Sequence, residues 1–153
     1  MQSDNLDILV EGHRVSESTP KIVDGRRKAR IISVQSLYES EMSGLDISIV
    51  SERLLGNQKI GKKDKELTRK ILKNITEKSS LIDEKISSAT VGFNINEMPS
   101  IDRNSLRVAI SESLIEPNLP KPIIINESIE VASCLGSDSS GSLINGILVT
   151  LLL

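Results

Sequence analysis

Apolar residues recur at helical spacing through most of the chain after residue 24. From Arg26 to about Ser43, one apolar stripe repeats every third or fourth position and predicts a helix; its members are Ile31, Val34, Tyr38 and Met42. Gly44 follows, as is typical of a left-handed residue that ends a helix. A shorter helix is predicted at about residues 46–55.

The same spacing continues through the middle of the chain. Residues 64–89 place isoleucines and a leucine on one helical face, either as one long helix or as two helices broken near Ser79–Ser80. Ser100 is suited to the N-cap of a further helix that runs to about Ile115. Its predicted inward face consists of Leu106, Ala109, Ile110 and Leu114.

Two segments near the end of the chain leave alternatives open. Pro122 suits the first turn of a helix ending at Gly136, but the β-branched triplet Ile123–Ile125 favours a strand. Asn145-Gly146 is typical of a tight hairpin, although the surrounding apolar residues also fit a last helix. The helix that starts near Pro122 would direct inward Ile125, Ile129 and Ala132.

Composition limits the class of protein. The 153 residues are 38% hydrophobic with one tyrosine and one phenylalanine, so one domain with a core of aliphatic side chains is expected. A single cysteine, Cys134, excludes an internal disulfide and a cysteine-rich metal site, and it is expected to be an inert core residue. The only histidine is His13. We therefore expect no metal, no cofactor and no enzymatic activity.

Residues 1–24 are polar and charged without a sustained period, and we interpret them as a mobile leader. They lack the basic start and apolar stretch of a signal peptide. The longest apolar run, residues 146–153, is far shorter than the roughly 20 residues needed to cross a bilayer. A cytoplasmic protein without a membrane contact is expected.

The sharpest local feature is Arg26-Arg27-Lys28-Ala29-Arg30, four cations in five residues without a local acid. A helix dipole disfavours positive charge at the helix N-terminus, whereas guanidinium groups match phosphate oxygens in pairs. A second basic region runs from Lys59 through Lys73. Because the net charge is −2, a polyanion site must be a local patch. The alternative is that both clusters only decorate solvated helix faces.

Four segments of the chain, in order, resemble the NusB family and together cover about residues 25–149. The basic cluster with Val34–Glu39 resembles the family's opening helix, and Ile101–Ala109 resembles its central signature. The other two segments are Pro120–Ala132 and Gly136–Leu148. The resemblance implies an all-α fold of two small packed bundles with about seven helices after the mobile leader. It places a helical domain at 25–153, with subdomains at 25–91 and 92–153, and makes both ambiguous segments helical.

The resemblance also implies a function. Family members are RNA-binding transcription antitermination factors that act on ribosomal RNA operons. They bind boxA RNA together with a NusE-type small-subunit ribosomal protein and reach the RNA polymerase elongation complex indirectly. A monomer or weak homodimer is expected. The positions that match RNA-contacting residues of the family are Arg26, Arg27, Lys28, Arg30, Ser139, Ser142 and Leu143.

One departure from the family pattern affects this function. Ser142 and Leu143 stand where the family has a basic residue and then phenylalanine, and a stacked aromatic contributes about 1–3 kcal/mol per base. The alternative is therefore a helical protein–protein interaction module that has lost or weakened RNA binding. A similar helical domain occurs in some RNA cytosine methyltransferases, but a sequence of 153 residues that matches this domain alone is expected to lack a cofactor-binding domain and not to catalyse methylation by itself.

Two further expectations concern charged residues. The helical acids are interpreted as solvated or capping charges; they are Asp102, Glu112, Glu127 and Glu130. We expect replacement of Arg27 and Arg30 by alanine to lower boxA affinity and to leave the helical content unchanged.

Overall fold

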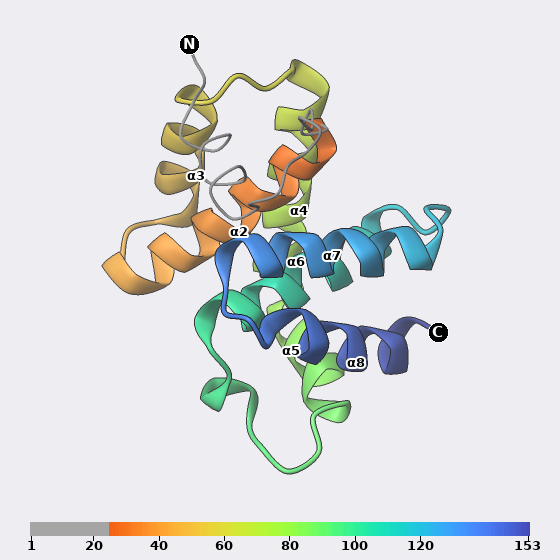
Figure 1. The fold of residues 1–153 in the computed structure, drawn as a ribbon. Helices are drawn as coiled ribbons and strands as arrows, with labels where there is room; N and C mark the ends of the chain where they lie inside the picture. The colour runs from red at the N-terminus through yellow and green to blue at the C-terminus, as the bar shows by residue number, and fades with distance from the viewer. Residues whose placement is uncertain (1–24) are drawn as a thin grey trace.

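The computed structural model describes residues 25–153, which form seven α-helices and one short 3-10 helix, without a β-strand among them (Figure 1). The all-α class and the number of helices are confirmed. The predicted mobile leader at 1–24 lies outside the described residues. The elements are α2 (Gly25–Ser43), α3 (Ile47–Gly56), α4 (Lys62–Glu77), α5 (Ser79–Ser88), η1 (Ile95–Glu97), α6 (Ser100–Ile115), α7 (Lys121–Leu135) and α8 (Ser140–Leu152).

Helix α6 is the central element, and it contacts α2, α4, α5, α7 and α8. Ten of its residues are buried, so it is enclosed by other helices rather than lying on the surface. Fully buried aliphatic side chains fill the contacts between the helices, as the aliphatic composition predicts; examples are Ile31, Ile71, Leu106, Ile110 and Ile144. No helix of residues 25–153 is long and apolar enough to span a bilayer.

Two arginines of the central signature tie α6 to its neighbours. Arg107 Nε and Nη2 donate to Asp83 of α5 at 2.8 and 2.9 Å. Arg103 pairs with Glu41 of α2 and donates to the Met98 carbonyl oxygen at 2.9 Å. These contacts give part of the signature a structural role. Helix α5 packs on α4, α6 and α8, and the boundary near residue 91 between two subdomains stays a prediction.

The segments for which the sequence left alternatives open are all helical. Residues 64–89 form two helices, separated at Lys78. Ile123–Ile125 belong to α7, with Pro122 in its first turn, and Asn145-Gly146 belong to α8. The strand and hairpin alternatives are therefore wrong, because helical spacing buries Ile124, Ile144 and Leu148 against neighbouring helices.

The structure corrects some local predictions. Ser100 is not the N-cap, because Pro99 holds that position and Ser100 is the first residue of α6. The apolar stripe of α2 is buried only in its first part, since Tyr38 and Met42 are 41% and 58% exposed. Helix α2 extends to the edge of the molecule at its C-terminal end, beyond most of its neighbours (Figure 1). Leu114 is also exposed, near the end of α6.

Candidate nucleic-acid interface

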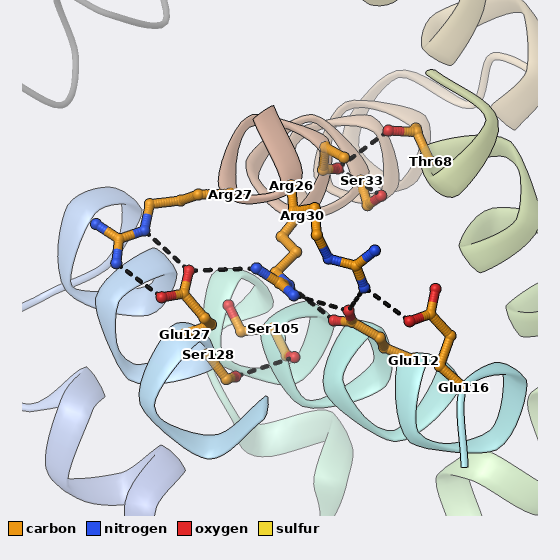
Figure 2. Close-up of polar contacts among 11 residues, drawn as sticks. Arg26, Arg27, Arg30, Ser33, Thr68, Ser105, Glu112, Glu116, Glu127 and Ser128 are labelled. Atoms are coloured by element: carbon orange, nitrogen blue, oxygen red, sulfur yellow. Dashed lines mark hydrogen bonds and ion pairs between the residues drawn. The ribbon is translucent and has the colours of Figure 1, made fainter. Parts of the chain in front are cut away.

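The basic cluster occupies the first two turns of α2, and its arginines point toward acids on α6 and α7 (Figure 2). Arg30 makes the most buried of these contacts. Its Nε and Nη2 each donate to Glu112 at 2.8 Å, and its Nη1 donates to Glu127 at 3.3 Å. The side chains of Arg30 and Glu112 are 6% and 1% exposed. This is a buried bidentate ion pair, in which each charge depends on the other for compensation.

The other two arginines lie nearer the surface. Arg26 Nη2 donates to Glu112 at 2.9 Å and to Glu116 at 2.8 Å. Arg27 donates to Glu127 through Nε at 2.9 Å and through Nη2 at 2.8 Å. Arg27 Nη1 lies 4.0 Å from the Glu130 carboxylate, which is beyond hydrogen-bonding distance. A guanidinium has five N–H donors, so Arg27 keeps donors that its contacts with Glu127 do not use.

These contacts favour the charged form of both arginines. Burial acts to lower the pKa of Arg26, but the hydrogen bonds and charges of Glu116 and Glu112 outweigh it and raise the pKa overall. The hydrogen bonds to Glu127 raise the pKa of Arg27, against a smaller opposing effect of burial. Both residues therefore remain cations at any pH at which a nucleic acid is studied.

Lys28 points in another direction from the arginines. Its Nζ donates to the backbone carbonyl oxygen of Lys59 at 3.3 Å. Lys59 begins the second basic region and precedes α4. The fold therefore brings together two basic clusters that lie about thirty residues apart in the sequence.

The second predicted region lies at the start of α8. Ser139 immediately precedes this helix and is exposed, as is Ser142 in its first turn. Leu143 is half-buried and packs against the core. The preceding turn needs a glycine at Gly136, because a Cβ there would lie 2.8 Å from the Ala132 carbonyl oxygen.

The acids that hold the basic cluster were not recognised as such from the sequence. Glu112 is buried, and so is Asp102, at 1% and 2% exposure, so the interpretation of these two as solvated or capping charges is wrong. Glu127 is half-buried and paired. The acids lie 82 to 100 residues from the arginines that they bind. Local charge patterns contain no signal for such a distant pairing.

The arrangement presents cations that are held in place by carboxylates. The hollow beside Arg30 has a volume of only about 10 Å³, which is too small for a substrate. Within residues 25–153, no group of three or more histidine, cysteine, aspartate or glutamate residues could hold a metal ion. Arg26, Arg27 and Lys28 are partly exposed, and their charged groups can bind an anion.

Comparison with known proteins shows the family to which this helical protein belongs. The model of the NusB family matches residues 27–152, and the chain belongs to the NusB family. The transcription antitermination protein NusB of Dehalococcoides mccartyi strain 195 is 36% identical over 123 residues, which cover 80% of this chain and 86% of that protein. The transcription antitermination protein NusB of Thermotoga maritima is 35% identical, over a region that covers 80% of this chain and 87% of that protein. The family is one of transcription antitermination proteins and not of enzymes.

Solved structures agree with this assignment. A structure of Thermotoga maritima NusB matches with a TM-score of 0.78 at 33% identity and covers 85% of this chain and 92% of that one. A crystal structure of antitermination factors NusB and NusE in complex with double-stranded RNA matches with a TM-score of 0.75. It covers 85% of this chain and 97% of the other, at 18% identity, so the likeness shows the fold alone.

Proposed function

We propose that this protein is a cytoplasmic RNA-binding transcription antitermination factor that acts on ribosomal RNA operons. It binds boxA RNA together with a NusE-type small-subunit ribosomal protein and reaches the RNA polymerase elongation complex through that assembly, as a monomer or weak homodimer. The observation that carries the proposal is the match of residues 27–152 to the NusB family. The crystal structure of NusB and NusE in complex with double-stranded RNA gives the proposal a precedent on the same fold.

The geometry of α2 suggests separate roles for the four cations. Arg26, Arg27 and Lys28 are partly exposed and would contact phosphates. Arg30 is enclosed by Glu112 and Glu127, so its role in the proposal is to hold the start of α2 against α6 and α7. Ser139, Ser142 and Leu143 would line the second RNA-facing region.

Replacement of Arg27 by glutamine tests the phosphate contact. Because one phosphate contact on single-stranded RNA contributes about −0.7 to the slope of log K against log salt, the variant should lower RNA affinity and make the slope less negative by about 0.7. The measurement is fluorescence anisotropy of boxA RNA with the NusE-type protein present, at several salt concentrations.

Lys85→Gln is the matched control, since Lys85 is exposed on α5 and the change in net charge is the same. It should leave both affinity and slope unchanged. If Arg27→Gln and the wild type had the same RNA affinity and the same salt slope, Arg27 would not contact the RNA. The alanine substitution of Arg30 does not serve this purpose, because it would leave Glu112 buried without its main partner.

A second candidate function is a protein-only interaction module with weakened RNA binding. Two observations favour it: the arginines of the basic cluster are already paired with carboxylates, and Leu143 packs on the core where the family has an aromatic residue. Titration of the NusE-type protein with and without boxA RNA separates the two functions. Partner binding that is indifferent to RNA would favour the second.

A further inference from the structure

The positive charge of the basic cluster is largely balanced within the protein. Its arginines lie against carboxylates of α6, of the residue that follows α6 and of α7; these belong to Glu112, Glu116, Glu127 and Glu130. Three arginines of the cluster thus face four acids, and even with Lys28 included the cluster adds little net charge to its surroundings. Attraction of a polyanion over distance depends on net local charge. The excess positive charge that attracts RNA must therefore come from another part of the surface.

The second basic region supplies that excess. Residues 59–73 contain seven cations and two acids, a net charge of +5 in a chain whose total is −2. Within this region, Lys62, Lys63 and Lys70 are exposed on α4. They form no ion pair with any acid of residues 25–153.

These lysines border a hollow that also includes a residue of the basic cluster. The open hollow has a volume of about 430 Å³ between α2, α4 and α6, and we call it the lysine hollow; its charged lining consists of Arg26, Lys62, Lys63, Glu66, Lys70 and Glu116. Both acids already have arginine partners, because Glu116 accepts from Arg26 at 2.8 Å and Glu66 from Arg69 at 3.4 Å.

We propose that the lysine hollow is a second RNA-backbone site, in which Lys62, Lys63 and Lys70 bind phosphates of the RNA that flanks the segment held by Arg27 and Lys28. This inference rests on the proposed RNA-binding function. Arg26 lines the hollow and Lys28 contacts Lys59, so the surface is continuous from α2 to α4. An RNA strand leaving the basic cluster would therefore meet α4 next.

The chemistry of the hollow suits phosphate better than an acidic protein. Its one apolar lining residue, Leu67, is only 4% exposed, so it offers no apolar anchor. Protein interfaces are depleted in lysine and depend on buried anchors. Lysine binds phosphate as a mobile point charge without a base preference. The site would therefore add affinity for RNA irrespective of its sequence.

The test uses the double variant Lys63→Gln/Lys70→Gln, because both residues are exposed and lie seven positions apart on one face of α4. Anisotropy titrations use boxA RNA with its natural flanks, in the presence of the NusE-type protein, over a range of salt concentrations. Loss of two phosphate contacts should make the log–log slope less negative by about 1.4 and lower affinity on the order of tenfold near 0.1 M salt. BoxA RNA without flanks should bind both proteins equally.

Two further variants complete the design. Lys63→Arg/Lys70→Arg preserves the charge and should retain the wild-type slope. Lys78→Gln/Lys85→Gln removes two other exposed lysines, with the same change in net charge from the wild-type −2, and should also retain it. Circular dichroism melting should be the same for all variants, since every substituted side chain is exposed.

The outcomes separate this inference from the proposed function. An unchanged slope in Lys63→Gln/Lys70→Gln, or an equal loss in the Lys78/Lys85 control, would overturn the lysine hollow as an RNA site while the antitermination function stands. Weakened binding of the NusE-type protein without RNA would instead make the hollow a protein contact. Absence of RNA binding by the wild-type complex would overturn the proposed function, and this inference with it.

Discussion

Arg27 and Arg30 lie three positions apart on one helix and have different surroundings. Arg27 is half-buried and contacts Glu127 at the surface, whereas Arg30 is 5% exposed and makes two hydrogen bonds with the buried Glu112. Removal of a surface ion pair costs little, because water solvates the remaining charge. Removal of one partner of a buried pair leaves a charge that water cannot reach. Identical side chains therefore have different roles, set by burial.

This difference predicts a large effect of Arg30→Met on stability. Glu112 binds both Arg26 and Arg30. Because the variant would leave Glu112 buried with Arg26 alone, the free energy of unfolding should fall by about 3–5 kcal/mol. Urea unfolding followed by circular dichroism measures it.

The control is the double variant Arg30→Met/Glu112→Leu, which removes both buried charges. It should be more stable than Arg30→Met alone, because an apolar pair of similar volume can replace a buried ion pair. A loss below about 1 kcal/mol for Arg30→Met, within the range of surface pairs, would contradict the structural role of Arg30.

At the scale of single elements, the end of α2 and the start of α3 follow local rules. Gly44 has φ 80°, the left-handed conformation that the sequence predicts for the end of this helix. Asp46 then caps α3, accepting from the Ser48 backbone N–H at 2.8 Å. The two helices therefore meet at a corner that is built from local contacts, and its stability should respond to changes in the backbone at Gly44.

Two glycine substitutions with opposite expected signs test this corner. Gly44→Ala should lower the free energy of unfolding by about 1–2 kcal/mol, because a Cβ is strained in the left-handed region. Nothing lies within 4 Å of the new Cβ, so packing contributes no further cost.

Gly56→Ala serves as the counterpart, because Gly56 ends α3 without a positive φ and its Cβ also meets open space. It should raise the free energy of unfolding by about 0.4–1 kcal/mol by restricting the unfolded chain. Thermal and urea unfolding of both variants measure the signs. A destabilised Gly56→Ala, or an unaffected Gly44→Ala, would show that the corner is not under local backbone control.

For the whole molecule, α6 joins the two predicted subdomains, 25–91 and 92–153. It packs on α2 and α4, which precede it by many residues, and on α7 and α8, which follow it. Ion pairs from Arg103 and Arg107 connect it to α2 and α5 as well. Because one helix completes the core on both sides, neither group of helices can bury its apolar face without α6.

This arrangement predicts one cooperative unfolding transition for the protein. Far-UV circular dichroism and native-state hydrogen exchange of α2 and α8 should report the same free energy of unfolding. A fragment of residues 25–91, which lacks α6, should remain unfolded by circular dichroism. Two separate transitions, or a folded fragment, would instead establish independent subdomains.

Much of the helical architecture could be predicted from the sequence, because helix formation depends on neighbours three or four positions apart. The spacing of Ile31 and Val34, the stop at Gly44 and the proline at Pro122 all correspond to features of the structure. The propensity of Ile123–Ile125 for strand was misleading, since burial against other helices outweighs such preferences. Tyr38 belongs to the apolar stripe of α2 and is nevertheless exposed, because periodicity does not reveal where a neighbouring helix ends.

The sequence by itself determined most of the helical segments and the presence of two clusters of positive charge, and its resemblance to the NusB family implied the all-helical class. Only the tertiary structure decided how those charges are distributed. It pairs Arg30 with Glu112, 82 residues away, and leaves Lys63 and Lys70 exposed on α4. The physical reason is that spacing along the chain acts through local geometry, whereas compensation of a charge depends on which helix packs opposite it.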